Sequence, residues 1–216
     1  MKFKSLIGRI NLLCMVTFLN LAGSCFADGV SALNQFLKIK NISANFKQTI
    51  FGHKKNQVST GIMKISRPNR FKWQYDSQGN NVGQQIISDG KKVFIVDKEL
   101  EQVTYKNLGQ TLNKSPAMVL AGDNDIKKFY NVKNVVTNDG IDWVSLTPKV
   151  ANDNNGFQEV LMGFNKTTHD LASMKFTDNF GGKSQINFTQ LKVEVEYKKD
   201  EFEFVAPHGY DVIDGN

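Results

Sequence analysis

Residues 71–75 read Phe-Lys-Trp-Gln-Tyr, with an aromatic side chain at every second position and a polar one between. This alternation is typical of a β-strand with one buried face, because successive side chains of a strand point to opposite sides of the sheet. The same period of two recurs upstream at residues 61–65. The pattern predicts that Phe71, Trp73 and Tyr75 lie together on the buried face of a sheet.

Similar runs extend in both directions along the chain, and turn sequences separate them. Ser88-Asp89-Gly90 lies between two apolar runs and predicts a hairpin, because Asp-Gly readily adopts the positive φ values of tight turns. No internal repeat or linker divides the sequence, so we expect one large antiparallel sheet. The other predicted strands cover residues 46–50, 61–65, 93–96, 101–105, 131–136, 141–147, 158–165, 171–177, 184–197 and 201–205.

Short segments with helical spacing interrupt the strands and could cover one face of the sheet. The predicted helical stretches are Val30–Leu37 after the cap Asp28, residues 117–120 after Ser115-Pro116, and a short segment from Asp123 that carries Ile126 and Phe129. A sheet that curls needs such a cover, since its inner face would otherwise leave apolar side chains in water.

The first residues have the layout of a secretory signal peptide. Three basic residues precede an apolar run from Ile10 to Leu21, and a small-residue site ends at Ala27. We therefore expect residues 1–27 to be cleaved and residues 28–216 to form a single domain. Removing 1–27 lowers the formal net charge from +6 to +3, with 24 basic against 21 acidic residues. That charge gives little support to nucleic-acid binding.

Both cysteines, Cys14 and Cys25, lie in the predicted leader, so the mature domain has no thiol for a disulfide, a metal or catalysis. The run ending at Cys25 is close to a lipoprotein-processing signal. Lipidation of Cys25 therefore stays open as an alternative to cleavage after Ala27.

The sequence offers few groups for catalysis. Gly182-Lys183-Ser184 lacks the earlier glycine of a phosphate-binding loop and fits a hairpin turn better. The three histidines, His53, His169 and His208, are widely spaced, and no nucleophile motif supports a triad with His169. We expect no cofactor, no metal and no enzymatic activity.

The run Arg67-Pro68-Asn69-Arg70-Phe71-Lys72-Trp73 resembles the Arg-Pro-x-x-Phe-x-Trp signature of the LolA family of outer-membrane lipoprotein carriers. The likeness covers nearly all of the mature chain, and its motifs occur in the family's order. The further motifs are Phe46-x-Gln48, Ser88-Asp89-Gly90, Ser115-Pro116-Ala117, Leu146-Thr147-Pro148 and the C-terminal run from Phe202 to Asp214.

The resemblance implies a mainly β fold with some α, namely an incomplete, curved antiparallel β-barrel covered by a lid of short helices. It implies a periplasmic chaperone that binds the acyl chains of lipoproteins released from the inner membrane. An inner-membrane ABC-type releasing complex would load such a carrier, and the outer-membrane receptor LolB would accept its cargo. We expect a monomer with no nucleic-acid partner.

The resemblance also implies roles for individual residues. The arginine that matches Arg67 holds the lid closed in the family, and we call this role the lid latch. The candidate residues of the acyl-chain cavity or lid are Phe71, Trp73, Phe94, Met118, Leu120 and Phe129. Three alternatives remain open: an outer-membrane-anchored acceptor of the same fold, similar to LolB, a small-lipid carrier, and a lipid esterase.

Overall fold

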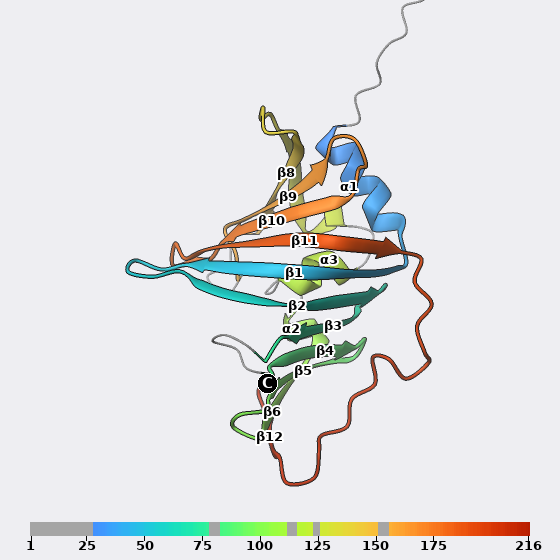
Figure 1. The fold of residues 1–216 in the computed structure, drawn as a ribbon, viewed down its shortest axis with the longest axis vertical. Coiled ribbons are helices and arrows are strands. Elements are labelled where there is room, and N and C mark those ends of the chain that lie inside the picture. Colours follow the sequence, from blue (N-terminus) through green and yellow to red (C-terminus); the bar gives the residue numbers. More distant parts are fainter. Residues whose placement is uncertain (1–27, 78–82, 112–115, 123–125, 151–155) are drawn as a thin grey trace, which may run out of the picture.

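A computed structural model describes residues 28–77, 83–111, 116–122, 126–150 and 156–216. In this part of the chain the strands form one 12-stranded sheet with the order β12-β6-β5-β4-β3-β2-β1-β11-β10-β9-β8-β7 (Figure 1). The strands are β1 (Asn41–Phe51), β2 (Gln57–Ser66), β3 (Arg70–Tyr75), β4 (Gln85–Asp89), β5 (Lys92–Asp97), β6 (Gln102–Asn107), β7 (Tyr130–Val135), β8 (Ile141–Pro148), β9 (Glu159–Asn165), β10 (Leu171–Thr177), β11 (Lys183–Val193) and β12 (Asp211–Asp214).

The centre of the sheet joins the two halves of the chain. β1 pairs antiparallel with β2 on one side and with β11 on the other, so the early strands meet the late ones there. Every other neighbouring pair is antiparallel as well, except that β12 runs parallel to β6. Such a sheet, curved and open, confirms the predicted mainly β fold.

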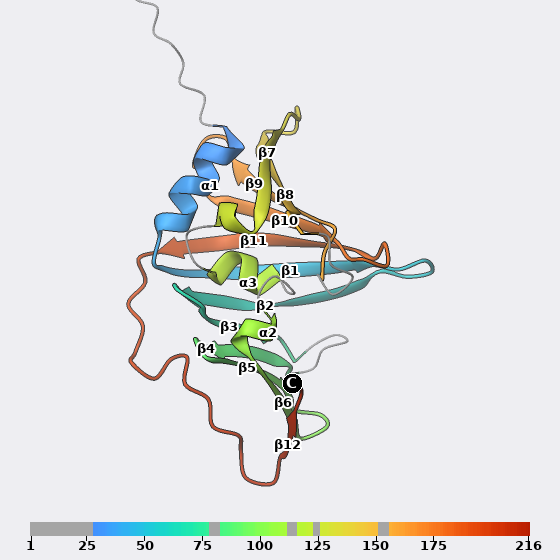
Figure 2. The ribbon, with the colours of Figure 1, turned by 180° about the vertical axis from the view of Figure 1, so that it is seen from behind.

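The helices lie on one side of the sheet, which we call the inner face (Figure 2). They are α1 (Gly29–Lys38), α2 (Leu108–Thr111) and α3 (Pro116–Ala121), and a 3₁₀ turn, η1 (Ile126–Lys128), follows them. Asp28 caps α1 as predicted, accepting a hydrogen bond from the Ser31 amide at 2.7 Å. α1 lies against β7, β8 and β9, and α3 lies against β2 and β3. None of the described helices has the length and apolarity needed to cross a membrane.

Some sequence predictions fall outside the described residues. These are the leader 1–27 with both cysteines, Ser115 at the expected helix start, and Asp123 at the start of the third helical segment. Of that third segment the structure describes only η1 and Phe129, which follows it.

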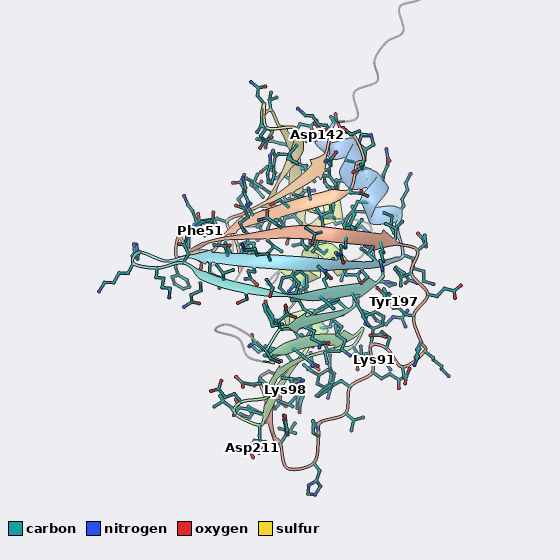
Figure 3. The ribbon with its side chains drawn as sticks, viewed as in Figure 1. Phe51, Lys91, Lys98, Asp142, Tyr197 and Asp211 are labelled. Carbon is teal, nitrogen blue, oxygen red and sulfur yellow. The ribbon has the colours of Figure 1, made fainter. Side chains whose placement is uncertain are left out.

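The end of the chain differs from the prediction. The strand predicted at 184–197 ends at Val193, and the strand predicted at 201–205 is wrong, because these residues form a turn and an extended segment without ladder pairing. Residues 194–210 instead form a connection, here called the strap, that leads from β11 to β12 (Figure 1). Figure 3 labels Tyr197 on the strap and Asp211 at the start of β12.

Side chains of the strap hold it against the sheet. The Tyr197 hydroxyl donates to the carbonyl oxygen of Ile42 at 2.6 Å, and Glu201 forms an ion pair with Lys64 at 2.7 Å. Phe202 is buried although it belongs to no strand. The alternating aromatic residues of the strap therefore serve packing across the sheet and not strand pairing.

Candidate functional site

The corner between β2 and β3 lies under the helices. The Arg67 amide donates to the carbonyl oxygen of Lys40 at 2.8 Å, and the Asn69 amide donates to that of Ala121 at 2.7 Å. Lys40 follows α1, and Ala121 is the last residue of α3. The backbone of this corner is thus bonded to the chain that follows one helix and to the end of another.

The Arg67 side chain makes a second set of contacts with the same helices. Its Nη1 donates to the carbonyl oxygen of Ile39, the C-cap of α1, and its Nη2 donates to that of Leu120 in α3 at 2.7 Å. Its guanidinium carbon lies 4.7 Å from the centre of the Phe36 ring. A guanidinium presents several N–H donors in a fixed plane, so one side chain can bond two helix ends at once.

Arg67 is unusual in its burial, since only 5% of its surface is exposed. Among the described residues no carboxylate forms an ion pair with it. Burial lowers the pKa of Arg67 to about 10, so the side chain stays charged at neutral pH. Carbonyl groups at the C-terminal ends of helices carry partial negative charge and provide the compensation that a carboxylate would otherwise give.

An aromatic surface covers the inner face beside this corner. The Phe46 ring lies 4.9 Å from the Trp73 ring and 5.2 Å from the Tyr75 ring, measured between centroids. Trp73 in turn lies 6.4 Å from Phe188 of β11. Offset and edge-on arrangements of this kind are favoured between aromatic rings. Phe46 and Phe188 were not among the predicted site residues, although Phe46 occupies the alternating pattern of its own strand.

A glycine makes room for this surface. A Cβ at Gly61 would lie 2.0 Å from the Gln74 carbonyl oxygen and 2.8 Å from the Phe46 ring. Gly61 faces Phe46 across the β1–β2 ladder. The missing side chain lets the Phe46 ring lie across β2, where it reaches the aromatic residues of β3.

Four of the predicted site residues come together here. Phe71 and Trp73 on β3 and Met118 and Leu120 on α3 belong to one buried core, each with 3% exposure or less. The α3 side chains occupy the inner face above β3. In this structure the apolar side chains of α3 therefore cover the part of the inner face that lies over β2 and β3.

Two predicted residues lie elsewhere. Phe94 lies on the outer face, because its cross-strand partner Ile87 points away from the helices. Its ring centroid lies 5.0 Å from that of Phe204 on the strap. We therefore assign Phe94 to a small apolar cluster on the outer face, built on Ile87, Val96 and Val103. It does not belong to the space beneath the helices. Phe129 follows η1 and is 49% exposed.

The three histidines lie in turns or bends of the chain. His169 lies in the turn between β9 and β10 with φ of +58°, and its amide donates to the Asn165 carbonyl oxygen. His53 and His208 are exposed. Within the described ranges, no three side chains of the metal-binding types gather in one place.

Comparisons with known proteins place the chain in a family. The family model "Outer membrane lipoprotein carrier protein LolA" matches residues 37–205. An outer-membrane lipoprotein carrier protein from Methylobacillus flagellatus is 34% identical over 92% of this chain and 95% of its own length. One of the same name from Neisseria meningitidis is 36% identical over 88% of this chain and 89% of its own length.

Solved structures share the fold at low identity. A DUF1329 family protein from Desulfovibrio piger aligns with a TM-score of 0.52 and 11% identity, covering 82% of this chain and 98% of the other. An uncharacterized conserved protein from Thermus thermophilus aligns with a TM-score of 0.51 and 9% identity, covering 86% and 96%. On the strength of the family match and of its carrier relatives, this chain belongs to the LolA family of outer-membrane lipoprotein carrier proteins.

Proposed function

We propose that this protein is a periplasmic chaperone that binds the acyl chains of lipoproteins and carries them from the inner membrane to an outer-membrane receptor. The observation that supports this most directly is the position of Arg67, which bonds two helices above an apolar inner face. An apolar surface beneath a displaceable cover suits cargo whose recognised part is a hydrocarbon chain.

Lipoprotein cargo needs such a surface for a simple physical reason. Each methylene that leaves water gains about 0.8 kcal/mol, so an acyl chain of about sixteen carbons costs on the order of 12 kcal/mol to expose. The inner face offers Phe71 and Trp73, with Met63 and Ile65 opposite them on β2. Aromatic and aliphatic side chains contact a flexible chain without requiring one conformation of it.

Cargo can reach this surface only when α3 moves away, because Met118 and Leu120 occupy it in the structure. Displacing α3 breaks the bond between Arg67 and the Leu120 carbonyl. We infer that Arg67 is the lid latch, a group that stabilises the closed state and so favours cargo release. Cargo then favours the open state of the lid, whereas Arg67 favours the closed state.

Replacing Arg67 with Leu tests this role. The variant loses the closed-state hydrogen bonds, so we expect it to accept a lipoprotein and to pass it to a receptor at least about tenfold more slowly. Arg70→Leu is the matched control. The guanidinium carbon of Arg70 lies 5.9 Å from the centre of the Phe202 ring on the strap, and its Nη2 donates to the Ser66 hydroxyl, so among the described residues its contacts lie away from α1 and α3. Transfer by Arg67→Leu at the wild-type rate would refute the latch.

The partners of this pathway are part of the proposal. An ABC-type complex of the inner membrane would supply the energy for loading, and the receptor LolB would take the cargo at the outer membrane. Co-purification from periplasm, followed by identification of bound acylated protein, tests the cargo class. Steady hydrolysis of an acyl ester would instead indicate an enzyme.

A membrane-anchored acceptor of the same fold is the second candidate, because Cys25 lies close to the expected cleavage site. The intact mass of the native protein separates the two. A chain that begins at Asp28 without added mass fits the carrier, whereas an acylated Cys25 at the N-terminus fits the acceptor.

A further inference from the structure

The two tryptophans of the chain lie on opposite faces of the sheet and differ in the hydrogen bonding of the indole N–H. Trp143 on β8 faces outward, and its indole Nε1 donates to the Asp139 carboxylate at 2.9 Å. Trp73 on β3 faces inward and is 2% exposed, and its Nε1 has no hydrogen-bond partner in the part of the chain that the structure describes.

A buried N–H without a hydrogen-bond partner lowers the stability of the fold, and a side chain without that N–H would avoid the loss. Phenylalanine offers a comparable ring without a polar atom, and Phe46, Phe71 and Phe188 surround the same face. Most buried donors in proteins have a partner, and an exception calls for an explanation. A donor that is unpaired in the closed state is explained if its acceptor arrives with the ligand.

Trp73 belongs to the sheet and not to the helices that cover it. β3 is bonded to β2 on one side and to β4 on the other, and the indole packs against Phe46 and Phe188 of the central strands. When α3 moves away from β3, the indole stays in place and its N–H becomes available to a ligand on the inner face. The donor is thus already positioned before cargo binds.

The surroundings of Trp73 limit the kind of acceptor. Its cross-strand neighbours are Met63 and Ile86, both apolar. A carboxylate would lose its hydration in such a place at high cost, whereas a neutral carbonyl would lose little. An acylated glycerol carries such carbonyls in its esters, at the head of each hydrocarbon chain.

We propose that the Trp73 indole N–H donates a hydrogen bond to an ester carbonyl of the acylated glycerol of the cargo. The inference rests on the proposed carrier function and deepens it, because it makes the inner face selective for ester-linked chains. Ether-linked chains of equal length and free fatty acids lack a neutral carbonyl at that position.

Two synthetic ligands test the inference with the mature protein. One is a peptide with an N-terminal S-(dioctanoylglyceryl)cysteine, and the other is its dioctyl ether analogue, both kept below the concentration at which they form micelles. We expect calorimetry to show that the wild type binds the ester about three- to tenfold more tightly than the ether, the range for one net hydrogen bond. Trp73→Phe should bind both alike, whereas Trp143→Phe should keep the preference.

A second measurement needs no substitution at Trp73. In ¹⁵N-labelled Trp143→Phe, Trp73 is the sole indole of the mature chain, and its N–H resonance should shift downfield with the ester and not with the ether. Equal affinity of the wild type for both ligands, or a preference kept by Trp73→Phe, would overturn the ester contact alone. If neither ligand binds, the carrier function and this inference are overturned together.

Discussion

Arg67 donates from Nη2 to the carbonyl oxygen of Leu120 across 2.7 Å, which bonds the β2–β3 corner to the C-terminal end of α3. Lysine at position 67 would keep a positive charge, but its single ammonium group lacks the planar fork that reaches two separate carbonyl groups. We expect Arg67→Lys to raise amide hydrogen exchange in residues 117–121 by about tenfold or more, since a hydrogen bond to a charged group contributes roughly 1.5–3 kcal/mol. Arg70→Lys serves as the control, and equal exchange in the two variants would contradict the role of the fork.

Gly61 is expected to tolerate no side chain. In Gly61→Ala the new methyl group meets the Gln74 carbonyl oxygen and the Phe46 ring, so we expect the free energy of unfolding to fall by about 1–3 kcal/mol or more. Urea denaturation measures the change. Gly109→Ala is the control, because a Cβ at Gly109 in α2 would meet nothing within 4 Å, and alanine favours helix.

The strap should depend on the contact between Phe94 and Phe204, whose ring centroids lie 5.0 Å apart. A double-mutant cycle with Phe94→Ala and Phe204→Ala is expected to give a coupling energy of about 0.5–1.5 kcal/mol. Val205→Ala provides the control, since Val205 is 87% exposed. Strict additivity of the two phenylalanine substitutions would show that the rings do not stabilise each other.

Asp139 should contribute to stability in acid. Hydrogen bonds from Thr137 and then from Trp143 lower the pKa of Asp139 from 3.8 to about 2. Because the folded-state pKa lies below the unfolded one, the contribution is present above about pH 4 and is lost as the pH falls towards 2. Asp139→Asn is therefore expected to flatten the loss of unfolding free energy across this window, as measured by urea titrations at several pH values.

Thr137→Val provides a second variant for the same test. It removes the strongest of those hydrogen bonds, so the pKa of Asp139 should rise and the acid-dependent loss should begin at higher pH. The same pH slope in the wild type and in both variants would show that Asp139 does not control this part of the profile.

Much of the fold could be predicted from the sequence, because the alternation of apolar and polar residues and the residue types of turns depend only on neighbouring positions. The Phe71–Tyr75 pattern, the hairpin at Asp89-Gly90 and the cap at Asp28 all appear where they were predicted. The Glu201–Val205 prediction failed because alternating aromatic residues can also arise from a segment whose rings pack onto strands that are already paired. β12 was missed because its pairing partner, β6, lies about a hundred residues earlier in the chain.

The site was only partly accessible. Alternation places neighbouring residues on opposite faces, but it does not say which face turns inward. For Phe94 that depends on its pairing with Ile87, a matter of register that only the structure gives. Arg67 was singled out through the family resemblance, whereas the contribution of Phe36 beneath its guanidinium arises from a contact between distant parts of the chain.

The short strand β12 has a consequence for how the protein behaves among its own copies. A strand at the border of a sheet exposes unpaired backbone groups to which a neighbouring molecule can add its own strand. β12 pairs with those groups on β6 and is itself a border of only 4 residues, while the opposite border, β7, presents the exposed Lys133, whose charge disfavours such addition. A chain shortened before Asp211 would leave β6 open, and fibre-like self-association would then compete with cargo transport.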